Sequence, residues 1–152
     1  MTVVLYFDTS ALVKQYVLEP GSEEVANILG AASLAGSSTI ARVELESALA
    51  KYVRMSALSL PDAKEIVSLF RFDWELLTQL ELGASIVALA SDLVWQHSLR
   101  GFDAIHLATA LKWQDAIIHP VTFATFDKNL WQAARDARLT PFPDNLSSFL
   151  AR

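Results

Sequence analysis

Four carboxylates stand close to points where an apolar segment of the sequence ends: Asp8, Glu44, Asp103 and Asp127. Asp8 directly follows the apolar run at residues 3–7, and Asp127 follows the run at residues 121–126. Strands built from such runs are buried on both faces, and their carboxyl ends form the edge where open α/β sheets bind ligands. Two carboxylates about 4–5 Å apart repel each other by roughly 3–4 kcal/mol at an effective dielectric constant of about 20. A cluster of such acids therefore indicates a bound hard cation and, with it, chemistry.

Each of these acids also has an ordinary structural explanation. Asp8 and Asp127 precede expected helices and can cap them, and Asp103 can cap the helix that it opens. Glu44 lies in the first turn of an expected helix, where the helix dipole favours a surface carboxylate. Two phosphotransfer sites are excluded, because Ser10 interrupts an Asp-x-Asp motif after Asp8 and no adjacent acidic pair is present there. The joint placement of the four acids at one sheet edge is what favours a site.

The composition favours a single domain covering residues 1–152. Hydrophobic residues make up 53% of the chain, which argues against disorder, and no uncharged apolar stretch is long enough to span a membrane. There is no cysteine and no pattern of a secretory signal, so we expect a cytoplasmic protein. The net charge of −5 weighs against a nucleic-acid partner, but it falls to −1 when the four carboxylates are set aside as a metal site.

The order of apolar runs and helical periodicities predicts an α/β fold with a mainly parallel sheet of about five strands and right-handed crossovers. Strands are expected at residues 2–7, 37–40, 74–82, 121–125 and 139–142. Helices are expected at residues 10–18, 22–32, 41–56, 59–72, 84–99, 103–113, 128–137 and 145–150. Ser22 is the expected N-cap of the second helix, and the Ser-Leu-Pro-Asp sequence from Ser59 is a helix-start signal for the fourth.

Several other residues that can do chemistry are expected to have ordinary roles. No two histidines have the helical spacing of metal ligands. His106 can either hydrogen-bond Asp103, three residues before it, or be a satisfied half-buried histidine, and we favour the second interpretation. The four tryptophans are expected in the core or in an interface rather than as base-stacking platforms. Glu46 projects away from the apolar stripe of its helix and is expected to be a solvated acid.

Four motifs follow one another along almost the whole chain. They are YFDTSALVKQY at residues 6–16 with EPGS at 19–22, ARVEL at 41–45, GFDAIHLATA at 101–110, and TFDKNL at 125–130. Each motif alone is weak. Together, in this order and at this length, they resemble PIN domains, and among them the VapC-type toxins of bacterial and archaeal toxin–antitoxin modules.

The resemblance implies a PIN-like three-layer α/β/α fold and an endoribonuclease that depends on Mg²⁺ or Mn²⁺. The family's cluster of catalytic and metal-binding acids corresponds by position to Asp8, Glu44, Asp103 and Asp127. Asp127 takes a place that varies in the family, and residues 118–120 before its strand depart from the family pattern. Ser10 and Thr125 match small hydroxyl residues near the cluster and are candidates for supporting roles.

The resulting hypothesis is hydrolysis of an RNA phosphodiester bond by in-line attack of water that the metal activates. Asp8 and Asp103 are then the principal ligands, and Glu44 is a ligand or a base. Asp127 is an outer ligand or a ligand of a second ion, and the choice between one ion and two stays open. The basic residues that are close in sequence to the cluster, and so are candidates for phosphate contacts as well as for ordinary solvated roles, are Lys14, Arg42, Arg100 and Lys128.

The family also suggests partners. A homodimer is expected, together with a cognate antitoxin protein that inserts a segment into the acidic groove and neutralises the carboxylates with an arginine. The RNA substrate and its cleavage site cannot be read from the chain. Two alternatives stay open. One is a PIN-like nuclease that processes RNA or cleaves DNA outside a toxin–antitoxin module, and the other is an inactive binding domain whose acids only cap helices.

Overall fold

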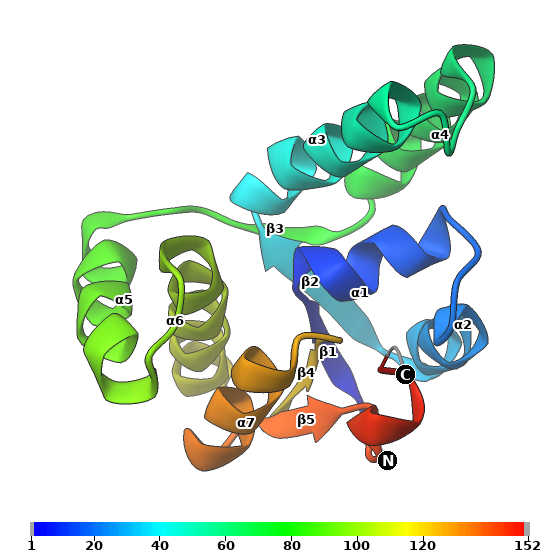
Figure 1. Ribbon diagram of the computed structural model, residues 1–152. Helices are drawn as coiled ribbons and strands as arrows, with labels where there is room; N and C mark the ends of the chain where they lie inside the picture. The colour runs from blue at the N-terminus through cyan, green and yellow to red at the C-terminus, as the bar shows by residue number, and fades with distance from the viewer. Residues whose placement is uncertain (1, 151–152) are drawn as a thin grey trace.

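A five-stranded sheet forms the centre of the computed structural model, which describes residues 2–150 (Figure 1). The strands are β1 (Val4–Phe7), β2 (Leu34–Ser38), β3 (Thr78–Leu80), β4 (Val121–Ala124) and β5 (Thr140–Phe142). Their order across the sheet is β3-β2-β1-β4-β5, and every neighbouring pair is parallel. The predicted α/β fold with a parallel sheet of about five strands is therefore confirmed.

Helices cover both faces of the sheet and complete the three layers (Figure 1). The α-helices are α1 (Thr9–Leu12), α2 (Ser22–Ala31), α3 (Ile40–Arg54), α4 (Leu60–Trp74), α5 (Ala84–His97), α6 (Gly101–Ile117) and α7 (Lys128–Asp136). Two single 3₁₀ turns, η1 (Val13–Gln15) and η2 (Leu146–Ser148), complete the described elements. One apolar cluster joins α5, α6 and α7 to the sheet, and a second joins α1 to α4 to its other face.

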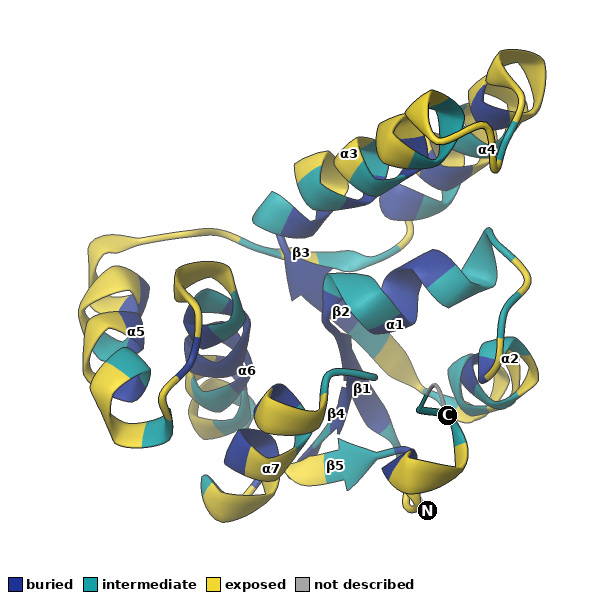
Figure 2. Ribbon diagram, in the orientation of Figure 1, coloured by how far each residue is buried: buried dark blue, intermediate teal, exposed yellow. Residues whose placement is uncertain are grey.

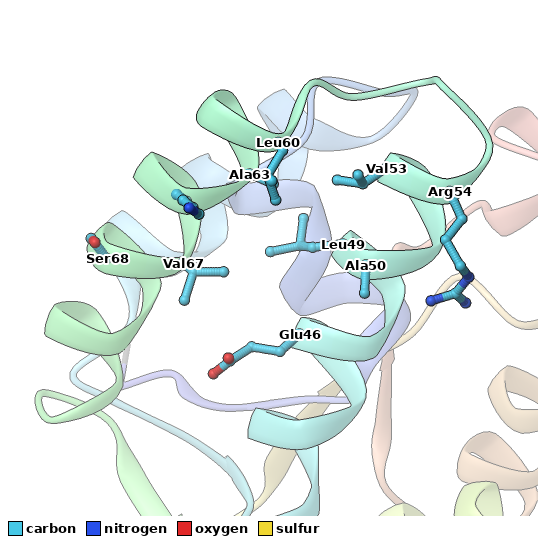
Figure 3. A pocket seen from close by; sticks show the side chains of 10 residues that line it. Glu46, Leu49, Ala50, Val53, Arg54, Leu60, Ala63, Val67 and Ser68 are labelled. Carbon is cyan, nitrogen blue, oxygen red and sulfur yellow. The ribbon is translucent and has the colours of Figure 1, made fainter.

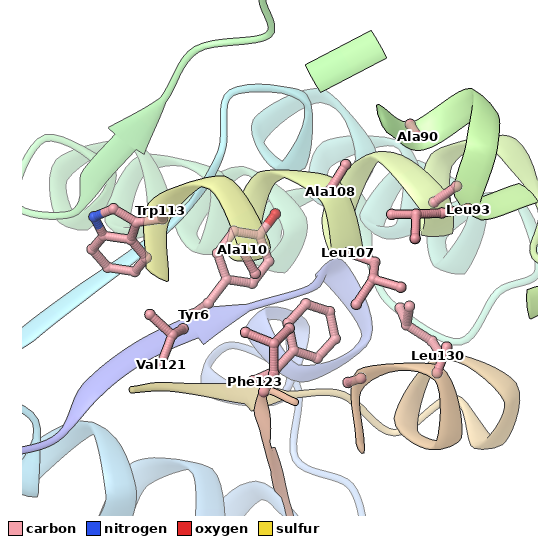
Figure 4. Packing of buried hydrophobic residues seen from close by; sticks show 14 of the residues in the cluster. Tyr6, Ala90, Leu93, Leu107, Ala108, Ala110, Trp113, Val121, Phe123 and Leu130 are labelled. Carbon is pink, nitrogen blue, oxygen red and sulfur yellow. The ribbon is translucent and has the colours of Figure 1, made fainter. Parts of the chain in front are cut away.

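The central strand β1 shows why its sequence is apolar without alternation. Val4 and Tyr6 point into the cluster beneath α5 and α6, whereas Leu5 and Phe7 point into the opposite cluster. All four side chains are buried, as the dark blue centre of Figure 2 shows. Figure 4 shows the first cluster, with Tyr6 lying between the sheet and α6. A strand covered on both faces delivers the next residue, Asp8, to the edge of the sheet.

Several predicted bounds differ from the structure: for example, β2 covers Leu34–Ser38 instead of residues 37–40, and α6 covers Gly101–Ile117 instead of residues 103–113. Three other differences have identifiable reasons. The strand expected from residue 74 begins only at Thr78, because Phe70 and Trp74, one helical turn apart, both bury their rings and extend α4. The last expected helix, at residues 145–150, is only the 3₁₀ turn η2. Ser22 is not the N-cap of α2. Gly21 has that position with a φ of 97°, a conformation that glycine adopts without steric cost.

The predicted start signal of α4 is confirmed. Ser59 caps α4 and accepts a hydrogen bond from the amide of Asp62 at 3.1 Å. Trp74 and Trp113 lie in the core, whereas Trp95 on α5 is 87% exposed. Within the described residues, no helix combines the length and the apolar character that crossing a membrane requires.

Candidate active site

The parallel sheet brings the predicted acids to its carboxyl edge. Asp8 follows β1 directly, and Asp127 stands three residues after the end of β4. Glu44 lies in α3, which follows β2, and Asp103 lies in the first turn of α6. Thr125 bonds both Asp8 and Asp127, and Arg100 pairs with both Asp103 and Asp127. Glu44 has separate partners, and one of them, His106, influences the pKa of Asp8 and of Asp103 through its charge.

Asp8 is buried and is held by hydroxyl groups from two sides. Ser10 donates to both of its carboxylate oxygens at 2.7 and 2.9 Å, and Thr125 donates to Oδ2 at 2.6 Å. The amide of Ala11 donates to Oδ1 at 2.9 Å, so Asp8 caps α1 while it also lies at the carboxyl end of the central strand. The amide of Phe126 fixes the Ser10 hydroxyl in turn. The two residues expected to support the cluster, Ser10 and Thr125, thus contact Asp8 directly.

The electrostatic environment of Asp8 is balanced between opposing effects. Burial raises the pKa of the Asp8 carboxyl, while the charge of His106 and the hydrogen bonds from Thr125, Ala11 and Ser10 act to lower it. The net effect is a pKa above the ordinary value. A cation beside Asp8 favours the deprotonated carboxylate and so relieves the cost of its burial.

Arg100 bridges Asp103 and Asp127. Its Nε lies 3.3 Å from Asp103 Oδ2, and its Nη2 lies 3.3 Å from Asp127 Oδ2. Burial, followed by the charge of Asp127, raises the pKa of Asp103, which Arg100 only partly offsets. Asp127 also caps α7, accepting a hydrogen bond from the amide of Leu130 at 2.9 Å. Asp103 does not cap α6, because Arg100 is the N-cap residue and its side chain makes no capping bond.

Glu44 makes two contacts that the sequence did not predict. Thr9 donates to Glu44 Oε1 at 2.7 Å, and His106 Nε2 lies 2.7 Å from the same oxygen. On its other side, His106 Nδ1 lies 2.7 Å from the hydroxyl of Tyr6. Burial alone acts to raise the pKa of Glu44, but the hydrogen bond and charge of His106 and the bond from Thr9 outweigh it, and the pKa is lowered.

The environment of His106 differs from the expected one. The ring is only 1% exposed, not half-buried, and it bonds Glu44 instead of the Asp103 that precedes it by three residues. The prediction that it is a satisfied histidine holds. Its partners come from β1 and α3, so helical spacing within α6 could not reveal them.

The chain is similar to known proteins along most of its length. The sequence pattern described as "PIN domain" matches residues 5–136. The chain belongs to the PIN-domain family. It is 32% identical over 143 residues to Ribonuclease VapC45 and to Ribonuclease VapC49 of Mycobacterium tuberculosis, covering 94% of this chain and 97% of each relative.

Solved structures share the fold of this PIN domain at lower identity. FitAcB from Neisseria gonorrhoeae has a TM-score of 0.68 and 20% identity, covering 94% of this chain and 98% of that one. VapBC2 from Rickettsia felis, bound to a DNA fragment from its promoter, has a TM-score of 0.63 and 13% identity, covering 91% and 97%. These likenesses show the fold. The prediction that the chain is a VapC-type PIN domain is confirmed by the family match and the mycobacterial relatives.

The donors at this edge of the PIN domain suit a hard, hydrated cation. They are carboxylate and hydroxyl oxygens, and the two ring nitrogens of His106 are engaged by Tyr6 and Glu44. Within residues 2–150, no three histidine or acidic side chains are arranged to hold one ion. Mg²⁺ needs only one or two carboxylates because it keeps several waters, so the acids fit an ion of this kind.

The basic residues near the PIN-domain site differ in their availability. Lys14 is paired with Glu19 at 2.9 Å and lies over the ring of Phe126, with its side chain only 10% exposed, which does not favour the expected phosphate contact. Arg42 lies 3.7 Å from Glu46 on the same helix. Arg100 is 82% exposed, and Lys128 is exposed at the start of α7.

Glu46, expected to be a solvated acid, is only partly exposed, with 23% of its side chain accessible. It forms ion pairs with Arg71 and Arg42. A hydrogen bond from Arg71 is the largest influence on its pKa, which is lowered. Glu46 thus lies two residues from Glu44 on α3 but belongs to a different set of contacts.

Two recesses flank this region of the PIN domain. A recess of roughly 500 Å³ is lined by Glu44, Asp103 and the exposed Phe102, with Arg100 at its border. A second recess, of roughly 610 Å³, lies between α3 and α4. Figure 3 shows its apolar side chains facing one another across the two helices, with Glu46 at one end. The first recess combines two acids and an arginine with apolar side chains, and the second is mainly apolar.

Proposed function

We propose that this PIN domain is a Mg²⁺- or Mn²⁺-dependent endoribonuclease and the toxin of a toxin–antitoxin module. The observation that carries the proposal is the delivery of Asp8, Glu44 and Asp103 to one sheet edge, in a chain whose relatives at 32% identity are named ribonucleases. Carboxylates gathered and partly buried at one edge lower the stability of the folded state unless a cation neutralises their charge.

The four acids take different parts in the proposed site. Asp8 and Asp103 are the principal candidates to hold the ion. Burial raises the pKa of both carboxyls, and a nearby cation offsets the cost of burying their charged forms. Glu44 is a ligand or a base, and its lowered pKa keeps it ionised. Asp127 is the outer member. A bound Mg²⁺ or Mn²⁺ supplies Lewis acidity and neutralises charge that develops on the phosphate in the transition state.

Ser10, Thr125 and Arg100 support these acids. The two hydroxyls orient Asp8, so its carboxylate needs no reorganisation when substrate arrives. Arg100 faces Asp103 and Asp127, and its exposed guanidinium is available to a flanking phosphate of the RNA. Lys128 is a second candidate for such a contact.

The test is cleavage of RNA by the purified protein with mapped end products. We expect cleavage with Mg²⁺ or Mn²⁺ and none with EDTA. Asp8→Asn keeps the size of the side chain and is expected to remain folded but inactive. Glu44→Gln is expected to lose activity, whereas its matched control Glu46→Gln, on the same helix, keeps it. Full activity of Asp8→Asn contradicts the proposed site.

A binding domain without catalysis is the competing function. In that case the acids act only as helix caps, and millimolar Mn²⁺ does not raise the melting temperature. Binding of the ion to the folded protein alone raises it by linkage. Thermal denaturation with and without Mn²⁺ therefore separates the two functions independently of the RNA chosen.

We also propose that an antitoxin helix occupies the recess between α3 and α4. The floor of the recess is apolar, with Leu49 and Val53 facing Ala63 and Val67, and the acid Glu46 closes one end. A helix with an apolar stripe matches this floor, whereas the charged groups at the recess include Arg54 and Lys64, and Glu46 is already paired with two arginines. An arginine of the same partner is then available to the acidic edge of a protein whose net charge is −5.

Co-expression with the product of the gene directly upstream tests this partner. The proposal expects the two proteins to copurify and Val67→Asp to release the partner while RNA cleavage by the free protein persists. A complex that tolerates Val67→Asp contradicts the assigned recess.

A homodimer is proposed as the assembly. Helix α5 exposes Val87 and Trp95, large apolar side chains that are costly to leave in water. Light scattering is expected to give twice the mass of 16.7 kDa, and Trp95→Glu to give the single mass. A wild-type monomer at micromolar concentration contradicts the proposal.

A further inference from the structure

A buried chain of hydrogen bonds runs from the backbone of β2 to the carboxylate of Glu44. The amide of Ser38 donates to the hydroxyl of Tyr6 at 3.2 Å, and that hydroxyl lies 2.7 Å from His106 Nδ1. His106 Nε2 lies 2.7 Å from Glu44 Oε1. Tyr6 and His106 are almost fully buried, and the Tyr6 ring stacks on Phe123 at 5.2 Å between centroids. In Figure 4 the hydroxyl of Tyr6 points toward α6.

The direction of these bonds follows from the donors around Tyr6. The amide of Ser38 can only donate, so the Tyr6 oxygen accepts there and has one proton left to give. The two other hydroxyls beside Tyr6, those of Ser37 and Thr109, donate to main-chain carbonyl groups at 2.6 Å. A tyrosine hydroxyl keeps its proton at neutral pH. His106 Nδ1, at 2.7 Å, is the side-chain nitrogen within reach to accept it.

The tautomer of His106 follows. A neutral imidazole that accepts at Nδ1 carries its proton on Nε2, which lies beside Glu44 Oε1. Thr9 donates to the same oxygen at 2.7 Å. Within residues 2–150, both hydrogen bonds to Glu44 therefore meet Oε1, which leaves Oε2 for the recess that Glu44 lines together with Asp103.

We propose that Ser38, Tyr6 and His106 form a positioning relay that fixes the orientation of the Glu44 carboxylate. His106 is a positioning residue, because it is buried, both of its ring nitrogens are engaged by protein side chains, and it acts through Glu44. The proposal rests on the proposed function for the role of Glu44. Groups that orient a metal-binding carboxylate typically change metal affinity or activity by about 10–100-fold when they are removed.

Nuclear magnetic resonance of the metal-free protein tests the direction of the relay. In protein with ¹⁵N-labelled histidine, His97 and His119 serve as internal references for the buried ring. We expect His106 to show a protonated Nε2 and an unprotonated Nδ1. Tyr6→Phe keeps the stacked ring but removes the donor to Nδ1, and we expect the fixed tautomer to be lost. A protonated Nδ1, or an unchanged spectrum in Tyr6→Phe, overturns the relay.

Two substitutions of His106 test the positioning role. A glutamine amide reaches approximately the position of Nε2 and can donate to Glu44, whereas an asparagine amide reaches only the position of Nδ1. We expect His106→Asn to lower Mn²⁺ affinity, measured by calorimetry, and RNA cleavage by about 10–100-fold, and His106→Gln to restore most of the loss. Equal losses in the two variants, with equal melting temperatures, mean that the ring only fills space and overturn the proposal.

These readouts keep the relay distinct from the nuclease assignment. If wild-type protein does not cleave RNA, the proposed function fails, while the ring spectrum and the Mn²⁺ titration still decide the relay. If wild-type protein cleaves RNA and the His106 tautomer is the opposite one, the relay fails alone.

Discussion

Asp127 combines two physical roles that two substitutions can separate. Its Oδ1 accepts the amide of Leu130 and caps α7, while its Oδ2 faces Arg100 beside Asp103. Asp127→Asn keeps an oxygen that can cap the helix but removes the charge. Asp127→Ala removes both. Because each variant removes the charge, the difference between them isolates the cap.

The size of that difference follows from the contacts. Loss of an N-cap costs about 1 kcal/mol, in a range of roughly 0.5–2 kcal/mol. The ion pair with Arg100 is at the surface and contributes little, and its loss is common to both variants. Removing the Asp127 charge also lets the raised pKa of Asp103 fall in both. We therefore expect Asp127→Ala to melt about 2–4 °C below Asp127→Asn in a chain of this length.

Thermal denaturation without metal measures the cap, and RNA cleavage with Mn²⁺ measures the carboxylate. If the charge belongs to the site, both variants lose activity to the same extent in spite of their different stabilities. Equal melting temperatures refute the capping role. Wild-type cleavage by Asp127→Asn refutes its membership of the site and leaves three acids.

Three further outcomes are expected. Because burial raises the pKa of Asp8 and Asp103, the contribution of these two groups to the stability of the metal-free protein falls as the pH rises through their folded-state values, whereas metal binding needs the deprotonated forms. The increase in melting temperature caused by Mn²⁺ should therefore become larger as the pH is raised from about 4. An increase that becomes smaller with rising pH would contradict metal binding by deprotonated Asp8 and Asp103. Gly36→Ala should lower the free energy of unfolding, measured by urea denaturation, by about 1–3 kcal/mol, because a Cβ there meets the carbonyl oxygen of Thr78 at 2.6 Å. Unchanged stability would show that β3 moves to make room for the methyl group. Arg100→Ala should weaken RNA binding and reduce its salt dependence by about one charge, with nearly unchanged melting, and an unaltered salt slope excludes a phosphate contact.

The sequence was sufficient for those features that local pattern controls. The unbroken apolar run before Asp8 predicted a strand covered on both faces, and all four residues of β1 are buried. The Ser59 cap followed from local chemistry in the same way. Because parallel strands end at one edge, the approximate meeting of Asp8 and Asp127 could be predicted as well. Their catalytic and metal-binding roles stay a prediction.

The sequence was insufficient where partners come from distant elements. His106 was compared with Asp103 because helical spacing makes them neighbours, but its ring bonds Tyr6 and Glu44 from other parts of the fold. Burial also decided the end of α4, where Trp74 extends the helix into a segment with strand-like alternation. Tertiary packing overrides local preference in such places.

The hydroxyl that holds Asp8 comes from a residue 117 positions further along the chain. Thr125 directly follows β4, the strand that pairs with one side of the central β1, and Asp127 comes two residues later. A ribosome that has translated the first hundred residues has therefore made Asp8 without Thr125 and Glu44 without His106, the later residues that bond them. The acidic edge is assembled only near the end of translation, so premature termination yields fragments that lack a complete site.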